Sequence, residues 1–148
     1  EISVCLVGSE MCIRDRLIAV PVMAIAATEA VNNRQQAFSS IEKLNKQVSS
    51  ELGNRNTDWK KVEELSGSLV EHGIVLNNSF AESDTGGKAK ETVWSKPEKF
   101  NQLMLQMNQG FTELQQASIE QDLSKAERGL DAANNTCRAC HRTYRSRW

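Results

Sequence analysis

A Cys-x-x-Cys-His motif near the end of the sequence constrains this chain more than any other feature. The motif is Cys137-Arg138-Ala139-Cys140-His141, and its spacing is the attachment signature of a c-type haem. On a helix, residues i and i+3 lie on one face, so both thiols can reach the two vinyl groups on one edge of a porphyrin. The adjacent imidazole can then coordinate the iron. We therefore expect one haem c, held by thioether bonds to Cys137 and Cys140 and coordinated by His141.

Other chemistries also use a Cys-x-x-Cys pair. A zinc site needs two further ligands at matching spacing, and a thioredoxin-like redox pair needs a βαβ context. The remaining cysteines, Cys5 and Cys12, lie in an N-terminal segment that differs in composition from the rest of the chain. Two incidental cysteines on a helix are a further alternative, which the directly following histidine makes weaker. These alternatives stay open beside haem attachment.

Residues 17–27 form an apolar run that follows Arg14 and Arg16 and closes with Ala24-x-Ala26. This is the pattern of a secretory signal with its small-residue cleavage site. The run is too short to span a bilayer, and a buried first helix is the alternative. We expect cleavage near Ala26 or Ala27, export to the periplasm, and a mature form without a membrane segment.

Residues 1–16 carry acidic residues where a signal peptide has a basic region. They are similar to the translated sequencing-adapter peptide that contaminates assembled reads. We expect this segment to be non-native, so that Cys5 and Cys12 carry no function. Residues 28–148 are then one domain.

The predicted domain is close to electrically neutral. The chain has 18 basic and 19 acidic residues, and residues 1–28 hold two of the basic and three of the acidic ones, which leaves equal numbers. A neutral surface argues against nucleic acid as a partner.

Apolar residues recur at helical spacing in four stretches, at about residues 30–52, 58–80, 95–114 and 122–144. Asp58 is placed to cap the second stretch, and the fourth begins near Asp122. Ser95 and Glu98 form a capping box before the third. The segment between Ala81 and Val93 shows no periodicity and is predicted to be a surface loop. Four amphipathic helices with mostly short connections predict an all-α fold, an antiparallel up-down four-helix bundle with the haem in its core.

Several motifs resemble the cytochrome c′ family, in which the haem motif also lies near the end of a secreted four-helix chain. The resemblance covers essentially all of residues 29–148. It rests on these residues: Ala30-Val31-x-x-Arg34-Gln35, Phe80, Gly86-Gly87, Trp94-Ser95 with Phe100, and Cys137-x-x-Cys140-His141-x-x-Tyr144-Arg145.

The function depends on what stands opposite His141. In an antiparallel bundle the start of the first helix lies across from the end of the fourth, which places Phe38 nearest the iron in the distal pocket. The resemblance implies the same position for Phe38. The expected mature first helix contains no Met or His, Met104 and Met107 at helical spacing are typical of core packing, and His72 is expected at the rim.

A five-coordinate iron under an apolar side chain binds NO and CO, whereas bound O₂ needs a hydrogen-bond donor that Phe38 lacks. The resemblance implies NO buffering or detoxification with electron-transfer capability. The alternative is a six-coordinate, low-spin electron-transfer cytochrome of the same fold. An enzyme such as a peroxidase is not expected, because no distal His or Arg is placed to cleave an O–O bond.

Two further pairs complete the predicted site. Arg34 lies on the inward stripe of the first helix, where a haem propionate is the natural partner of its guanidinium, and Gln35 stands beside it. The resemblance implies that Arg145 tunes the proximal side of the iron, with Tyr144 next to it. The alternatives are an exposed rim charge for Arg34 and a solvated basic tail for Arg145, which would dock an acidic redox protein.

The family usually forms homodimers through its first two helices, so the resemblance implies a homodimer.

Overall fold

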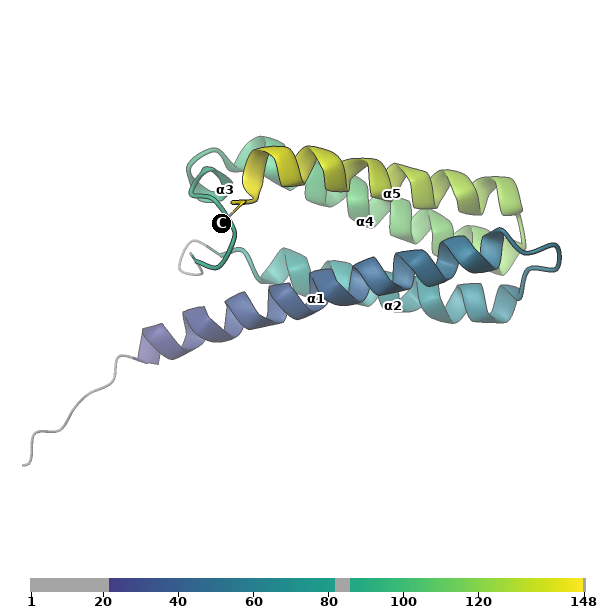
Figure 1. The fold of residues 1–148 in the computed structure, drawn as a ribbon, viewed down its shortest axis with the longest axis horizontal. Helices are drawn as coiled ribbons and strands as arrows, with labels where there is room; N and C mark the ends of the chain where they lie inside the picture. The colour runs from purple at the N-terminus through teal and green to yellow at the C-terminus, as the bar shows by residue number, and fades with distance from the viewer. Residues whose placement is uncertain (1–21, 82–85, 148) are drawn as a thin grey trace, which may run out of the picture.

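The structure is a computed structural model, and it describes residues 22–81 and 86–147. Side chains are described from Glu29 onward within these ranges. The helices in this part of the chain are α1 (Val22–Leu52), α2 (Trp59–Asn78), α3 (Thr92–Ser95), α4 (Pro97–Glu120) and α5 (Leu123–Tyr144) (Figure 1). The predicted non-native segment, residues 1–16, and the first part of the predicted signal segment lie outside the described residues. The helix α1 begins within that signal segment, at Val22.

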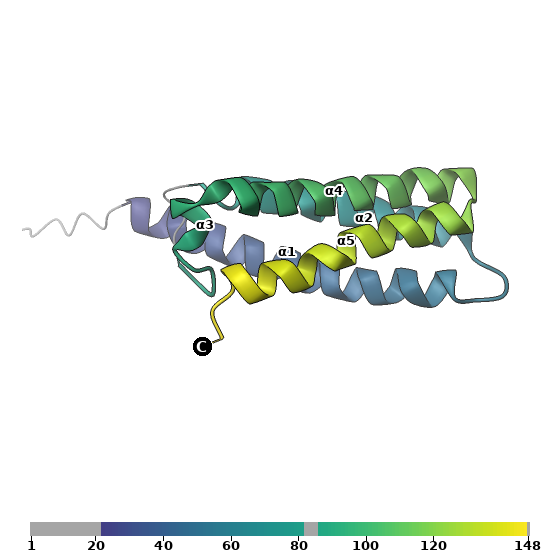
Figure 2. The same ribbon diagram turned by 90° about the horizontal axis from the view of Figure 1, so that it is seen from above.

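The four long helices form an antiparallel bundle of two layers, α1 with α2 and α4 with α5 (Figure 1). Contacts run round the bundle from α1 to α2, α2 to α4, α4 to α5 and back from α5 to α1. The predicted all-α, up-down four-helix bundle is confirmed. Seen from above, α3 and the loop around it cover the end of the bundle where α5 finishes (Figure 2). In the described residues no helix is both long and apolar enough to pass through a lipid bilayer.

The predicted cap at Asp58 and the predicted helix start near Asp122 are confirmed, whereas the predicted capping box at Ser95 is wrong. The side chains of Asp58 and Asp122 accept hydrogen bonds from the backbone N–H groups of Lys61 and Lys125, at 3.1 and 3.0 Å. The predicted capping box at Ser95 does not form. Ser95 instead ends the short helix α3, and α4 is preceded by Lys96 without a side-chain cap. The predicted loop 81–93 therefore contains the start of an extra helical turn.

A continuous apolar core fills the space between the layers. Its fully buried members come from all four long helices: Val48, Val62, Leu69, Leu76, Phe111, Leu114, Ala126 and Ala133. Met104 and Met107 are 5% and 4% exposed and belong to this core. Their interpretation as packing residues is confirmed.

The helices α4 and α5 approach each other closely at two glycines, Gly110 and Gly129. A Cβ atom at Gly110 would lie 2.7 Å from the backbone nitrogen of Ala133 and 2.7 Å from the carbonyl oxygen of Gly129. A Cβ atom at Gly129 would lie 2.7 Å from the backbone nitrogen of Leu114. The neighbours are backbone atoms, which cannot turn away, so glycine is required for this spacing of the two helices.

We expect Gly110→Ala to lower the free energy of unfolding by about 1–3 kcal/mol, because separating two packed backbones outweighs the gain in helix propensity. Chemical denaturation followed by circular dichroism measures the change. Gly67→Ala on α2 is the matched control. Its Cβ would meet only the side-chain nitrogen of Gln115, at 3.3 Å, so its free energy of unfolding should stay the same or rise by up to about 1 kcal/mol. Equal effects of the two substitutions would contradict the close contact.

Candidate functional site

The three residues of the haem motif lie near the C-terminal end of α5. Both cysteines are free thiols and partly buried. The Cys137 Sγ lies 3.9 Å from the carbonyl oxygen of Ala133, one turn earlier, and Cys140 packs against the core. His141 is exposed. The helix thus presents two adjacent thiols and an accessible imidazole at the same end.

Burial and neighbouring charges set the protonation of these groups. Burial raises the pKa of Cys137, and burial together with the nearby Cys137 raises the pKa of Cys140 to about 11. Both thiols are therefore neutral at pH 7. The pKa of His141 is lowered, chiefly because the protein shields part of the ring from water and then by the charge of Arg145, while Glu42 opposes this. A neutral imidazole is the form that coordinates a metal.

Phe38 lies on α1, the helix that contacts α5 from the other layer. Its side chain is 39% exposed, and its ring meets the Phe80 ring edge-on at 6.3 Å. Phe80 also contacts Phe100 at 4.8 Å, and Phe100 contacts Tyr144 at 5.3 Å. One chain of rings therefore runs from α1, past the ends of α2 and α4, to the end of α5.

Arg34 is 3% exposed, so the prediction of an inward-facing guanidinium agrees with its position. Its Nη1 donates to the carbonyl oxygen of Ser79 at 3.2 Å and its Nη2 to that of Gly86 at 2.7 Å. The guanidinium also lies 4.8 Å from the ring centre of Phe80 and 5.6 Å from that of Trp94. Arg34 therefore ties α1 to the loop after α2.

The loop after α2 needs glycine to reach Arg34. Gly86 and Gly87 have positive φ angles of 131° and 63°, which other residues rarely adopt. A Cβ atom at Gly87 would also lie 3.0 Å from Val31 and 3.3 Å from the side-chain nitrogen of Gln35. The exposed amide of Gln35 thus lies beside this loop.

The end of α5 is joined to the same loop by backbone pairing. Lys90 N–H donates to the carbonyl oxygen of Tyr144 at 2.9 Å, and Ser146 N–H donates to that of Lys88 at 2.8 Å. Arg145 forms an isolated antiparallel bridge with Ala89 and has extended backbone angles. The helix ends at Tyr144, and the charge of Arg145, four residues after His141, acts on that imidazole. Tyr144 is buried against Phe100.

The donor set fits a covalently bound haem. Two adjacent neutral thiols, an accessible imidazole, a buried guanidinium and an apolar ring come from α5 and α1, at the end of the bundle that the loop covers. Within the described residues no group of three or more His, Cys, Asp and Glu side chains is arranged to bind a metal ion directly.

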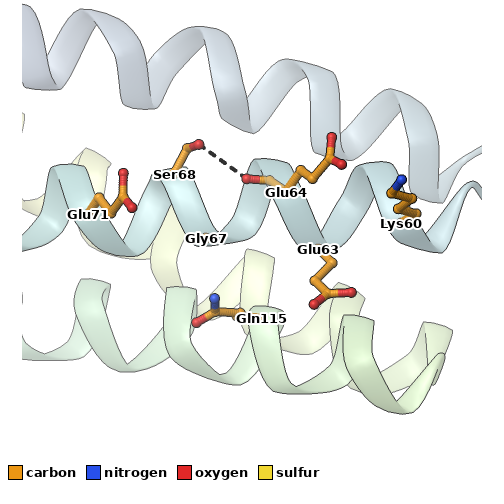
Figure 3. Close-up of a pocket in the computed structure, with 7 residues that line it drawn as sticks. All are labelled: Lys60, Glu63, Glu64, Gly67, Ser68, Glu71 and Gln115. Atoms are coloured by element: carbon orange, nitrogen blue, oxygen red, sulfur yellow. Dashed lines mark hydrogen bonds between the residues drawn. The ribbon is translucent and has the colours of Figure 1, made fainter.

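A hollow on another face of the bundle lies between α2 and α4 (Figure 3). It is lined by Lys60, Glu63, Glu64, Gly67, Ser68, Glu71 and Gln115. The three carboxylates point in different directions (Figure 3), and none of these residues belongs to the haem motif. The hollow is separate from the candidate site.

The antiparallel bundle and the Cys-x-x-Cys-His motif on its last helix define a helical protein of the cytochrome class. The family described as cytochrome C′ matches residues 29–145. The chain therefore belongs to the cytochrome c′ family, which implies a haem protein.

Solved structures of cytochrome c′ from Alcaligenes xylosoxidans share the fold. They include the reduced form of an arginine-to-alanine variant (21% identity, TM-score 0.75) and the nitric oxide complex of a leucine-to-alanine variant (22% identity, TM-score 0.76). They also include the ferrous form of a leucine-to-phenylalanine variant (23% identity, TM-score 0.75). Each alignment covers 82% of this chain and 97% of the other. No curated protein matches the chain.

Two features of the site were not predicted from the sequence. Glu42 lies on α1, and its pKa is lowered mainly by its hydrogen bond to Lys46, with smaller effects from Arg145 and His141. Asn45 donates a hydrogen bond to Asn134 of α5. Both residues follow Phe38 at helical spacing, by four and seven positions, and this spacing was the available signal.

We expect Arg34→Ala to lower the free energy of unfolding by about 2–4 kcal/mol, because two carbonyl groups lose a charged donor and two rings lose a cation. Thermal and chemical denaturation measure the loss. Arg34→Lys keeps the charge but not the fork of donors, so it should recover only part of it. If Arg34→Ala is as stable as the unaltered protein, then the contacts of this guanidinium are energetically unimportant.

Proposed function

We propose that the protein is a periplasmic c-type haem protein that binds NO, and CO more weakly, at a vacant axial position of a five-coordinate iron. The observation that carries the proposal is the composition of α1, the helix that contacts α5. It contributes the apolar, partly exposed Phe38, and residues 29–52 include no Met, Cys or His that could act as a sixth ligand. The nitric oxide complexes among the similar structures support the same ligand.

In this proposal each residue of the site has one task. Cys137 and Cys140 hold a single haem c through two thioether bonds, and His141 provides the proximal ligand. The bound haem supplies an iron atom that bonds small diatomic gases. Arg34 places a buried positive charge where a propionate carboxylate is attracted, and the amide of Gln35 lies beside the same loop.

The proposed selectivity comes from Phe38. Bound O₂ carries negative charge and is stabilised by a distal hydrogen-bond donor, whereas NO and CO bond strongly through the metal alone. A phenyl ring donates no hydrogen bond, so it favours NO and CO over O₂. The same ring must move aside for a ligand, which slows binding. Arg145 and Tyr144 close the proximal side, with Arg145 acting through its charge on His141.

A second candidate function is electron transfer to an acidic redox protein. The observation that favours it is the group of exposed basic residues at the end of the chain, Arg138, Arg142, Arg145 and Arg147. Such a surface attracts an acidic partner electrostatically. This function requires no vacant axial position, so the two candidates differ in the coordination of the iron.

We further propose a role in buffering or detoxifying NO, without a catalytic side chain, and a homodimer through α1 and α2. Ile74 and Val75 on α2, which are 56% and 40% exposed, support the dimer because they form an apolar surface on one of the two helices concerned. Periplasmic location rests on the signal pattern of residues 17–27.

The spectrum of the haem-loaded, reduced protein tests the proposed function. We expect a high-spin, five-coordinate ferrous spectrum that changes on addition of NO or CO. His141→Ala should keep the covalently attached haem, seen by mass spectrometry, while losing the spectrum of the axial imidazole. A low-spin spectrum that CO does not alter would favour the electron-transfer function.

We expect Phe38→Ala to speed CO association about tenfold, equivalent to a barrier lower by about 1.4 kcal/mol. Flash photolysis of the CO complex measures the rate. Leu105→Ala is the control, because Leu105 is an apolar side chain that is 57% exposed and belongs to α4, not to the helix that carries Phe38. Its rate should not change. An unchanged rate in Phe38→Ala would mean that this ring does not cover the iron.

A further inference from the structure

The seam between α1 and α5 contains a polar pair that the proposed function does not use. Of the four neighbouring pairs of long helices, α1 and α5 make the sparsest contact in the described part of the chain. Across this seam the side-chain Nδ2 of Asn45 donates to the side-chain oxygen of Asn134 at 3.0 Å, in a partly buried position. A direct hydrogen bond thus links the two helices that carry Phe38 and His141.

The position of the pair relates Phe38 to His141. Asn45 lies seven residues after Phe38 on α1, and Asn134 lies seven residues before His141 on the antiparallel α5. Seven residues make nearly two full turns, so each Asn lies on the same helix face as its partner residue, about 10.5 Å along the axis. The hydrogen bond between the two Asn residues therefore brings Phe38 and His141 to the same level of the bundle.

The charges at the same end of the bundle agree with this register. Glu42, four residues after Phe38 on α1, lies close enough to Arg145 and His141 at the end of α5 to be affected by their charges. A slip of one helical turn between α1 and α5 would move these groups about 5.4 Å relative to each other. The register therefore decides which side chain of α1 faces the imidazole.

The pair is poorly suited to a purely stabilising role. The side-chain oxygen of Asn45 is buried and accepts no hydrogen bond in the structure, and a buried polar atom without a partner is unfavourable. A buried Asn pair between helices has a different known consequence. It disfavours other registers, because a slip would leave both amides facing apolar side chains.

We propose that Asn45 and Asn134 are positioning residues that fix the register of α1 against α5 and so hold Phe38 opposite the iron ligand His141. The inference rests on the proposed gas-binding function for its kinetic consequence, but the register itself is independent of it. Neither residue touches the ligand-binding position. They act through the placement of Phe38.

The test replaces the pair with apolar side chains of similar size in Asn45→Leu/Asn134→Leu, in the haem-loaded protein. Removing a buried polar pair should leave thermal stability equal or higher. CO association should become several-fold faster and lose its single-exponential form, because Phe38 no longer has one position. Val62→Ala on α2 is the control. It removes buried apolar volume from a helix that is not one of the two forming the seam, so it should lower stability and leave CO association unchanged.

Two further measurements separate the possible results. In the Phe38→Ala background the Asn substitutions should have no additional effect on CO association, because the ring that they position is absent. Crystal structures of the unaltered protein and the double variant should show α5 shifted or rotated against α1. An unchanged register with unchanged CO kinetics would overturn the proposal. If the unaltered protein binds no CO, the proposed function fails, and the register comparison alone still decides the role of the pair.

Discussion

The contact between α4 and α5 at Gly110 and Gly129 is the constraint on which the rest of the structure depends. Because neither residue has a side chain, the two backbones approach until atoms of one helix fill the space where a Cβ of the other would lie. This contact holds one face of α5 firmly against α4. Cys137 and Cys140 follow Gly129 by eight and eleven residues, so the thiols lie on the same side of α5, two to three turns nearer its end. The contact between α5 and α1 is sparse. A cofactor helix needs this combination of firm packing on one neighbour and loose packing on another.

Much of the fold was predictable because it depends on local pattern. Apolar residues at spacings of three and four predicted all four long helices, and Asp58 and Asp122 predicted two of their starts. The Cys-x-x-Cys-His motif was recognisable for a similar reason, since Cys137, Cys140 and His141 lie within five residues of one helix. Where a function depends on residues close in sequence, the sequence shows it directly.

The remaining features depend on contacts between distant residues, and local pattern did not show them. The capping box at Ser95 was wrong because the preceding residues form a short helix of their own, which competes for the same backbone groups. The partners of Arg34 are backbone carbonyl groups 45 and 52 residues away, and no side-chain pattern marks them. The Asn45–Asn134 hydrogen bond spans 89 residues and follows only from the register of the two helices.

The chain of aromatic rings at the covered end of the bundle links events that would otherwise be independent. Phe80 supports the ring of Phe38 on one side and the guanidinium of Arg34 on another. A molecule that pushes Phe38 aside therefore also disturbs the seat of the buried cation and, through Phe100, the packing of Tyr144. Entry of a ligand beside Phe38 would then displace side chains as far away as Tyr144 through direct contact between rings, although no bond joins these residues.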